Sequence, residues 1–232
     1  DSDVVFSTHR AHAHYLAKGG DLKKMIAELY LRETGCCGGR GGSMHLNDQD
    51  VGFKGAVPIV GSTIPIATGA ALKFAMKGEH HVALTFFGEA ATEEGVFYES
   101  INFAALKNLP IIFFCENNLY SVYSPLSVRV PKNRKIIELV KAAGINAVQG
   151  DGNDVAEVFT HVDTAVKKAR NGGGATFLEL MTYRWREHCG PSFDDQLGYR
   201  PEGELDHWMK LDPTIRTQEE LISMGELNTE KV

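Results

Sequence analysis

Two oxygen-bearing side chains, Glu89 and Asn118, stand where they could bind a metal ion together. Each follows an apolar run, at residues 82–87 and 111–115 respectively. Runs of this length with a helical pattern between them are typical of buried parallel strands, whose carboxyl ends meet at one sheet edge. Carboxylate and carboxamide oxygens suit Mg²⁺. A plainer interpretation stays open, in which Glu89 begins a helix and Asn118 lies in a turn.

The backbone around Glu89 is also suited to a phosphate group. Gly88 and Ala90 carry little or no side chain, so a diphosphate can approach the main chain there. A helix is predicted at residues 92–107, and its N-terminus would direct free N–H groups to the same place. These features predict a site for a metal-bound diphosphate.

The triplet Gly150-Asp151-Gly152 also places a carboxylate between small residues, but it is a weaker candidate for such a site. Asn118 lies 29 positions after Glu89, whereas the residue 29 positions after Asp151 is Leu180, an apolar side chain inside a predicted strand. Asn153 and Asp154 precede an amphipathic segment, so we interpret this pair as a helix N-cap.

The elements that must position these residues alternate between strand and helix along the chain. Further strands are predicted at residues 145–148 and 175–183, and the chain opens with a short apolar run at residues 4–6. Further helices are predicted at residues 64–76, 136–143 and 154–170, with shorter helical pieces after an N-cap at Asp21, around Leu205 and at residues 219–224. The alternation predicts an α/β fold, with a mostly parallel sheet and helices on both faces. No linker divides the chain, so we expect one domain over residues 1–232.

Composition argues against several classes of protein. The formal net charge of −6 gives no electrostatic reason to bind nucleic acid or an anionic membrane, and no apolar run approaches the roughly 20 residues that span a bilayer. The four cysteines include no CxxC pair, which favours a reducing compartment such as the cytoplasm and argues against a disulfide or zinc framework. Because the chain starts at Asp1, a removed organellar targeting segment stays open as an alternative.

Five segments resemble one protein family, in that family's own order. Their sequences are GCCGGRGGSMH, PIVGSTIPIATGAAL, NFAALKNLPIIFFCENN, GDGNDV and FLELMTYRWREH. They are similar to the alpha subunit of thiamine-diphosphate-dependent 2-oxoacid dehydrogenases, the first component of the pyruvate, branched-chain and acetoin dehydrogenase complexes. The stretch from Gly88 to Asn118 resembles the family's cofactor motif. The resemblance implies a thiamine-diphosphate-binding fold in a chain that is incomplete at both ends.

The same resemblance implies a metal set at the sheet edge. Glu89, Asn118 and the backbone carbonyl of Tyr120 match the positions that hold Mg²⁺ on the cofactor diphosphate. Glu89 replaces the commoner aspartate, as it does in the branched-chain members. Ala90 replaces a glycine, and both Gly88 and Ala90 are expected beside the diphosphate.

Further positions match the family's cofactor contacts. His9 and Arg10 fall where the family has Tyr-Arg at the phosphates, and a guanidinium can bind two phosphate oxygens at once. A surface ion pair stays open as the plainer role of Arg10. Ile59, Val60 and Gly61 resemble the segment at the aminopyrimidine, where Val60 would hold the cofactor bent, although on the sequence alone Val60 is a core valine.

The active-site histidine of the family matches His188. The tasks implied are stabilising the substrate carboxylate or an intermediate and assisting acyl transfer, which suits histidine near neutral pH. Arg184 matches an arginine near the phosphates. His12 and His45 match histidines near the active site, and packing within loops is equally open for both.

The resemblance implies the alpha subunit of an oxidoreductase that decarboxylates a 2-oxoacid, or cleaves acetoin, and passes the acyl group to a lipoyl domain. It also implies a beta subunit in an α2β2 assembly, which supplies the glutamate that activates the cofactor, and a lipoyl-bearing acyltransferase. Two alternatives stay open. One is a single-subunit thiamine-dependent synthase, and the other is a cofactor-binding or assembly module without catalysis.

Overall fold

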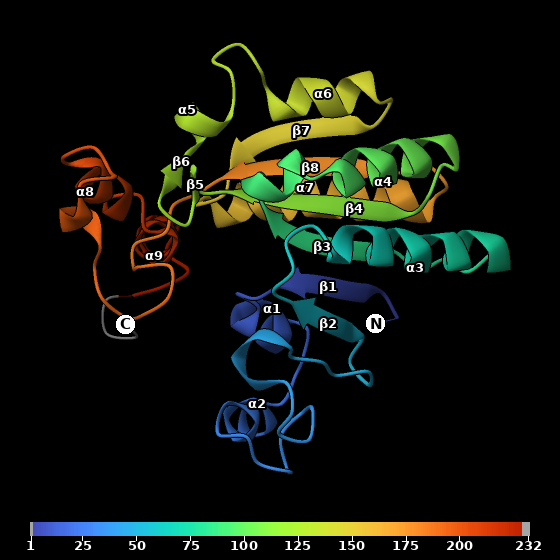
Figure 1. The fold of residues 1–232 in the computed structure, drawn as a ribbon, viewed down its shortest axis with the longest axis horizontal. Helices are drawn as coiled ribbons and strands as arrows, with labels where there is room; N and C mark the ends of the chain where they lie inside the picture. Colours follow the sequence, from blue (N-terminus) through green and yellow to red (C-terminus); the bar gives the residue numbers. More distant parts are fainter. Residues whose placement is uncertain (1, 229–232) are drawn as a thin grey trace.

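The computed structural model describes residues 2–228, and one six-stranded parallel sheet forms its centre (Figure 1). The strands lie in the order β2, β1, β3, β4, β8, β7, and each neighbouring pair is parallel. Their bounds are Val4–Thr8 (β1), Phe53–Val57 (β2), Ala83–Gly88 (β3), Ile111–Asn117 (β4), Asn146–Asp151 (β7) and Thr176–Met181 (β8). The carboxyl ends of all these strands therefore lie along one edge.

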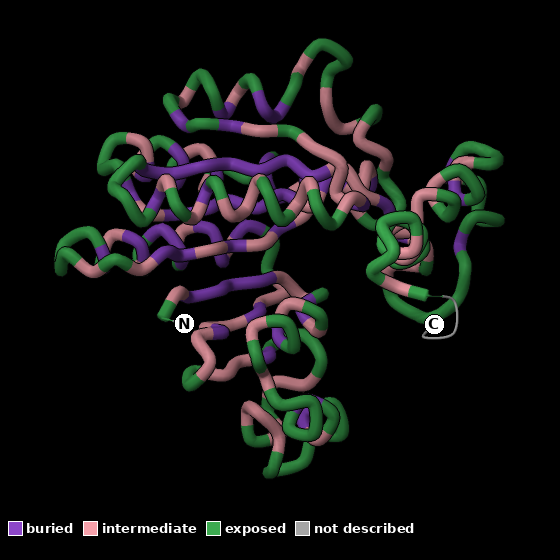
Figure 2. The backbone as a smooth tube through the Cα atoms, turned by 180° about the vertical axis from the view of Figure 1, so that it is seen from behind, coloured by how far each residue is buried: buried purple, intermediate pink, exposed green. Residues whose placement is uncertain are grey.

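Helices cover both faces of the sheet. One face packs against α3 (Thr63–Lys77), α4 (Gly95–Leu106) and α6 (Ile136–Ala142). The other packs against α1 (His12–Ala17), α2 (Leu22–Leu29) and α7 (Val155–Arg170). Successive strand residues serve opposite faces, so Phe113 belongs to the first core and Phe114 to the second. Figure 2 shows that burial concentrates in the central strands.

The smaller elements gather near the carboxyl edge or lead to it. They are the antiparallel pair β5 (Tyr120–Ser121) and β6 (Ser124–Pro125), the short helix α5 (Leu126–Arg129), the helices α8 (Glu204–Met209) and α9 (Pro213–Ser223), and the 3-10 turns η1 (Gly42–Met44), η2 (Glu89–Glu93) and η3 (Asp195–Leu197). In Figure 1, α8 and α9 lie beyond the carboxyl ends of the strands. Within residues 2–228, no helix combines the length and apolar character needed to cross a membrane.

The predicted α/β class is confirmed, and so are both predicted N-caps. The Asp21 carboxylate accepts the N–H of Lys24 at 2.8 Å, and the Asp154 carboxylate accepts the N–H of Glu157 at 2.9 Å. Asp151 ends β7 in the literal Gly-Asp-Gly triplet, with Asp154 serving the following helix, as expected for a cap and not a cofactor motif.

The helix predicted at residues 92–107 is wrong at its start. A 3-10 turn, η2, begins directly at Glu89, and Glu94 is extended (φ −74°, ψ 138°), so α4 begins only at Gly95. The extended residue interrupts the helical ladder of hydrogen bonds. The backbone groups nearest Glu89 are therefore those of a short turn, and not those of the α4 N-terminus. No pattern in the sequence predicted β2, α1, α5 or the β5–β6 pair, and β1 was expected only as a short apolar run.

Candidate functional site

A cavity of about 340 Å³ opens at the carboxyl edge of the sheet. It gathers residues from the ends of β1, β3 and β4 and from the loop before α3. The lining side chains and backbone predicted from the sequence are His9, Arg10, Val60, Gly61, Gly88, Glu89, Ala90, Asn118, Tyr120 and His188. Open α/β sheets bind ligands at this edge. The structure thus brings together most of the predicted cofactor positions.

Glu89 is the buried carboxylate of this cavity, with a side chain only 1% exposed. Burial raises the pKa of the Glu89 carboxyl, and the guanidinium of Arg129 opposes that increase. Arg129 donates a hydrogen bond to Oε1 of Glu89. A buried carboxylate of this kind needs a cation as a partner, and the sequence offered no sign that Arg129 would supply it.

Asn118 and Tyr120 lie in an irregular turn after β4. The Asn118 side-chain oxygen accepts the N–H of Tyr120 at 3.0 Å, which leaves that oxygen a second lone pair. Leu119 (φ 70°) and Val122 (φ 55°) both adopt the left-handed region that side chains other than glycine disfavour. Such backbone strain is typical of functional sites, and here it flanks the predicted third ligand.

The phosphate side of the cavity carries His9 and Arg10. Arg10 Nη2 donates to the carbonyl oxygens of His188 (2.7 Å) and Glu187 (3.4 Å), so it fastens the loop that follows β8. Nε2 of His9 is buried without a hydrogen-bond partner. Burial, and then Arg10, lower the pKa of His9. A buried nitrogen of this kind is suited to a ligand that enters the cavity.

His188 faces His9, with ring centroids 5.2 Å apart. Burial lowers the pKa of His188 to about 4, helped by the charges of Arg10, His9 and Arg184. The imidazole is therefore neutral near pH 7, in a form that can accept or donate one hydrogen bond.

Arg184 is buried behind the cavity wall and is not among the lining residues. Its guanidinium donates to Asp194 Oδ2 (3.0 Å), the Val122 carbonyl oxygen (3.0 Å) and the Tyr199 hydroxyl (2.9 Å). These contacts hold the loop after β8 against the β5–β6 turn. A direct phosphate contact by Arg184 stays a prediction.

His12 and His45 lie outside the cavity lining. His12 Nε2 is 2.9 Å from the Ser43 hydroxyl, and His45 Nδ1 is 3.2 Å from the Gly41 carbonyl oxygen. His12 thus contacts the glycine-rich loop at residues 35–45, and His45 makes a contact within that loop. Ile59 also lies outside the lining and is 70% exposed, whereas Val60 and Gly61 beside it line the cavity.

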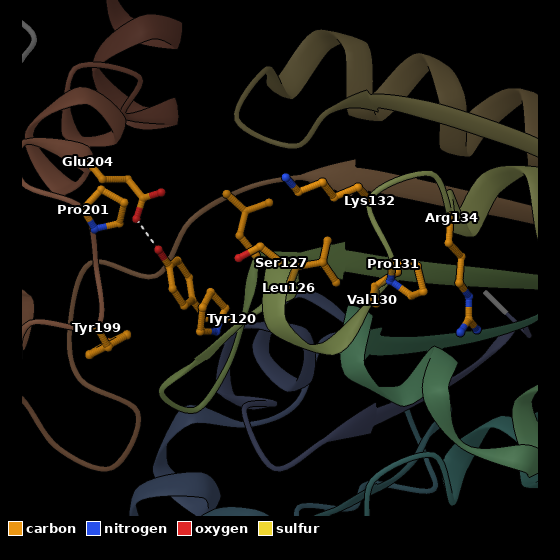
Figure 3. Close-up of a pocket in the computed structure, with 12 residues that line it drawn as sticks. Tyr120, Leu126, Ser127, Val130, Pro131, Lys132, Arg134, Tyr199, Pro201 and Glu204 are labelled. Atoms are coloured by element: carbon orange, nitrogen blue, oxygen red, sulfur yellow. Dashed lines mark hydrogen bonds between the residues drawn. The ribbon is translucent and has the colours of Figure 1, made fainter.

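A larger cavity of about 500 Å³ lies next to this one, with Tyr120 lining both (Figure 3). Its only carboxylate, Glu204, is occupied by hydrogen bonds from the hydroxyls of Tyr120 and Tyr183. Neither Glu89 nor the phosphate-side residues reach it. The predicted cofactor residues therefore gather in the smaller cavity and not in this larger one.

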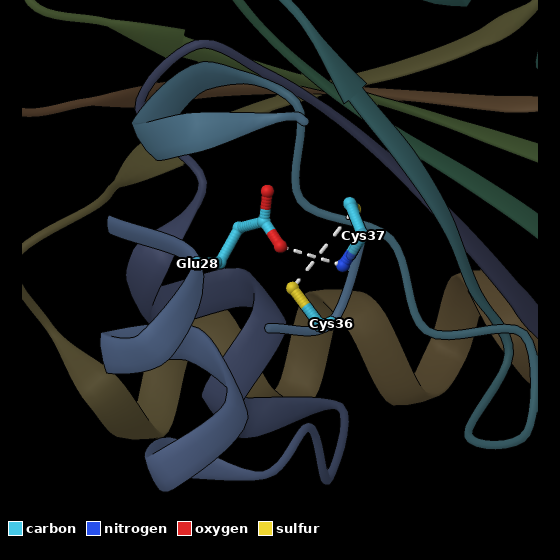
Figure 4. Close-up of side chains that lie close together, drawn as sticks. All are labelled: Glu28, Cys36 and Cys37. Atoms are coloured by element: carbon cyan, nitrogen blue, oxygen red, sulfur yellow. Dashed lines mark hydrogen bonds between the residues drawn. The ribbon is translucent and has the colours of Figure 1, made fainter. Parts of the chain in front are cut away.

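Glu28, Cys36 and Cys37 form the one cluster within residues 2–228 that has the geometry of a metal site (Figure 4). The Glu28 carboxylate is already saturated, because it accepts four backbone N–H groups of the glycine-rich loop. Burial raises the pKa of the Cys37 thiol to about 12, which keeps it protonated. The contacts of Glu28 instead hold the glycine-rich loop together.

Ser7, His14 and Glu116 make a chain of contacts that the sequence did not suggest. The Ser7 hydroxyl is 2.7 Å from His14 Nδ1, and His14 Nε2 is 3.3 Å from Glu116 Oε1. The order resembles a hydrolase triad. However, Ser7 is 0% exposed, so no substrate can reach its hydroxyl and the arrangement is structural.

The residues present fit a diphosphate with a bound cation. A side chain built on Gly88 would meet no atom within 4 Å, so a group can lie above that backbone. Glu89 and Asn118 offer oxygen ligands, and Arg10 and the unpartnered His9 nitrogen offer groups for phosphate. One rearrangement is required, because Arg129 holds the Glu89 oxygen.

Comparisons with known proteins identify the family of this chain. The alpha subunit of acetoin:2,6-dichlorophenolindophenol oxidoreductase from Bacillus subtilis is 42% identical, over 79% of this chain and 55% of that protein. The corresponding subunit from Cupriavidus necator is 37% identical, over 99% of this chain and 69% of that protein. The pyruvate dehydrogenase E1 component subunit alpha from Porphyra purpurea is 37% identical, over 97% and 68% respectively.

The chain therefore spans between about half and two thirds of the length of these relatives. None of the comparisons supports a single-subunit synthase or a non-catalytic module. The family model for the dehydrogenase E1 component matches residues 1–232. The chain belongs to the dehydrogenase E1 component family.

Proposed function

We propose that this chain is the cofactor-binding alpha subunit of a thiamine-diphosphate-dependent dehydrogenase. Its reaction is decarboxylation of a 2-oxoacid, or cleavage of acetoin, with transfer of the acyl group to a lipoyl domain. The observation that carries the proposal is the cavity at the sheet edge, which combines Glu89, Asn118 and Tyr120 with Arg10 and His188. Similar proteins include the alpha subunits of acetoin:2,6-dichlorophenolindophenol oxidoreductase and of the pyruvate dehydrogenase E1 component.

In this proposal, the two ends of the cavity divide the work of binding. Glu89, Asn118 and the carbonyl of Tyr120 hold Mg²⁺, which prefers oxygen ligands in octahedral geometry. Arg10 and His9 bind the diphosphate oxygens. Val60, which lines the cavity, supports the cofactor in a bent shape, and Gly61 beside it turns the chain at φ 78°.

Bound thiamine diphosphate would supply a nucleophilic carbon and an electron sink for the loss of carbon dioxide. The contribution of this chain at the reacting end is His188. Because its pKa is lowered to about 4, His188 is neutral at pH 7 and can hold or accept a proton at one ring nitrogen. Its loop is fixed by Arg10, so the imidazole is held in position before substrate arrives.

A second chain is proposed to complete the cavity. Met44 (45% exposed) and Val60 (51%) line the cavity and expose apolar surface, and Ile59 (70%), next to Val60 in the chain, adds to it. Apolar side chains gathered at the mouth of a polar site are typical of a protein interface. The proposed partner is a beta subunit in an α2β2 assembly, with a lipoyl-bearing acyltransferase as the acceptor of the acyl group.

The proposed localisation of the protein is the cytoplasm. The four cysteines are all free, as suits a reducing compartment. Separation of cytosolic and organellar fractions, followed by detection of the native protein, tests this assignment. Recovery with organelles would contradict it.

The function is tested with the full-length protein, purified alone and together with its beta subunit. Calorimetric titration with thiamine diphosphate and Mg²⁺ should show metal-dependent binding. A screen of 2-oxoacids and acetoin with an artificial electron acceptor should then show turnover by the reconstituted pair. Absence of binding both with and without the beta subunit would contradict the proposal.

Two buried carboxylates make a matched pair of variants for the metal assignment. Glu89→Gln should abolish metal-dependent cofactor binding. Glu179→Gln is the control, because Glu179 is also buried but accepts hydrogen bonds from Asn117 (2.8 Å) and Gln149 (3.1 Å) outside the cavity. Equal loss of cofactor affinity in both variants would remove Glu89 from the proposed metal set.

A further inference from the structure

The carboxylate proposed as a metal ligand already carries a cation from its own chain. Arg129, at the end of α5, donates to Glu89 Oε1 through one terminal nitrogen and to Glu93 Oε1 through the other. Its Nε donates to the Ser124 carbonyl oxygen at 3.2 Å. The Arg129 side chain is only 13% exposed. Three partners therefore hold this guanidinium against the Glu89 carboxylate.

The guanidinium and a metal ion compete for this place. Arg129 occupies Oε1 of the Glu89 carboxylate that the ion would use, and a divalent ion beside a guanidinium in a site of low dielectric repels it strongly. Arg129 also has somewhere to go, since the contacts with Glu93 and Ser124 do not involve Glu89. It can release the metal carboxylate and keep two of its three partners.

We propose that Arg129 is a built-in counter-ion, which holds the cation position on Glu89 in the metal-free chain and yields it when Mg²⁺ binds. The exchange spares Glu89 from being buried without a partner before the cofactor arrives. It also makes Arg129 a determinant of metal affinity. The inference rests on the proposed function, since it takes Glu89 as the metal carboxylate.

The first test is a calorimetric titration of Mg²⁺ into the full protein with its beta subunit, at saturating thiamine diphosphate. Arg129→Gln should bind Mg²⁺ about ten-fold more tightly than the wild type, because a competing charge-assisted hydrogen bond is removed. Arg129→Lys keeps the positive charge but loses the planar guanidinium that reaches two carboxylates at once, so its Mg²⁺ affinity should lie between those of the wild type and Arg129→Gln. Arg134→Gln is the control, since Arg134 lies on the same segment but donates to the Tyr98 hydroxyl.

The second test needs neither metal nor cofactor. Thermal unfolding of the metal-free protein should show a lower Tm for Arg129→Gln, and the double variant Glu89→Gln/Arg129→Gln should recover most of the loss. Additive effects in this cycle would overturn the inference. So would Mg²⁺ binding of equal or weaker affinity in Arg129→Gln. Absence of Mg²⁺ and cofactor binding in every form, wild type included, would instead contradict the proposed function, and the inference with it.

Discussion

Two loops reach the carboxyl edge of the sheet, and each is built around one buried carboxylate. The glycine-rich loop at residues 35–45 surrounds Glu28, whose oxygens accept four backbone N–H groups at 2.6–3.1 Å. The loop after β8 surrounds Asp194, which contacts the guanidinium groups of Arg184 and Arg200 at 3.0 Å each and the Tyr199 hydroxyl.

The difference lies in the partners. Glu28 is held by neutral main-chain groups, so its loop depends on backbone conformation. Asp194 is held by charged side chains, and one of these, Arg184, also helps to lower the pKa of His188. The first loop is therefore organised by its backbone, whereas the second places a charged side chain close enough to His188 to influence its pKa.

The largest effect is expected when Asp194 is changed. Asp194→Asn would leave Arg184 and Arg200 buried without their counter-charge, and we expect a loss of about 3–5 kcal/mol in the free energy of unfolding. Urea denaturation measures this. The exposed neighbour offers a control, because Asp195→Asn should stay within about 0.5 kcal/mol of the wild type. Similar losses in both variants would remove Asp194 from the centre of the loop.

Glu28→Gln should cost somewhat less. The amide oxygen can still accept two of the four N–H groups, while the amide nitrogen faces the other two, and we expect a loss of about 3 kcal/mol. The same denaturation experiment applies, with Glu33→Gln, which lies on the surface, as the control. Retention of full stability would show that the loop does not depend on this carboxylate.

Substitutions at the adjacent glycines Gly38 and Gly39 should distinguish backbone strain from steric crowding in the loop at residues 35–45. Both have positive φ, but a side chain at Gly39 would lie 2.7 Å from the backbone of Leu31, whereas one at Gly38 would meet nothing within 4 Å. We expect Gly38→Ala to cost about 1 kcal/mol through strain alone. Gly39→Ala should cost about 2 kcal/mol or more, because its neighbour is rigid. Equal losses would mean that the loop adjusts freely.

The pH dependence of stability should distinguish the second loop from the first. His188 has its pKa lowered to about 4 in the fold, against an ordinary value of 6.5. The unfolded chain therefore binds a proton at His188 between these values, and the folded chain does not, so stability should fall as pH falls from about 6.5 towards 4. His188→Gln should flatten that part of the curve. An unchanged slope would contradict the assigned environment of His188.

The regular part of the fold was predictable because its patterns are strong. The runs that became β3 and β4 are almost entirely apolar, and α7 follows a clear amphipathic repeat with a capping Asp154. By contrast, β2 includes Lys54 and Gly55 and gives no such pattern.

The site was likewise predictable where the sequence carries a strong pattern and unpredictable where it does not. The gathering of Glu89, Asn118 and Tyr120 at one cavity was predictable because strand ends and a family motif coincide there. The roles of Arg129 and Glu93 were not, because their contacts depend on the path of the irregular segment after β4. Neither spacing nor composition could indicate that Arg184 would turn inward to Asp194. Long-range contacts made by loops decided these cases.

The central claim is that one edge of the sheet binds a metal-bound diphosphate through Glu89, Asn118 and Tyr120. A crystal structure of the protein loaded with thiamine diphosphate and Mn²⁺, with the ion located by its anomalous signal, tests it directly. The expected result is an ion about 2 Å from the Glu89 carboxylate, the Asn118 side-chain oxygen and the Tyr120 carbonyl, with Arg129 turned away from Glu89. An ion bound elsewhere, with Arg129 still on Glu89, would contradict the account.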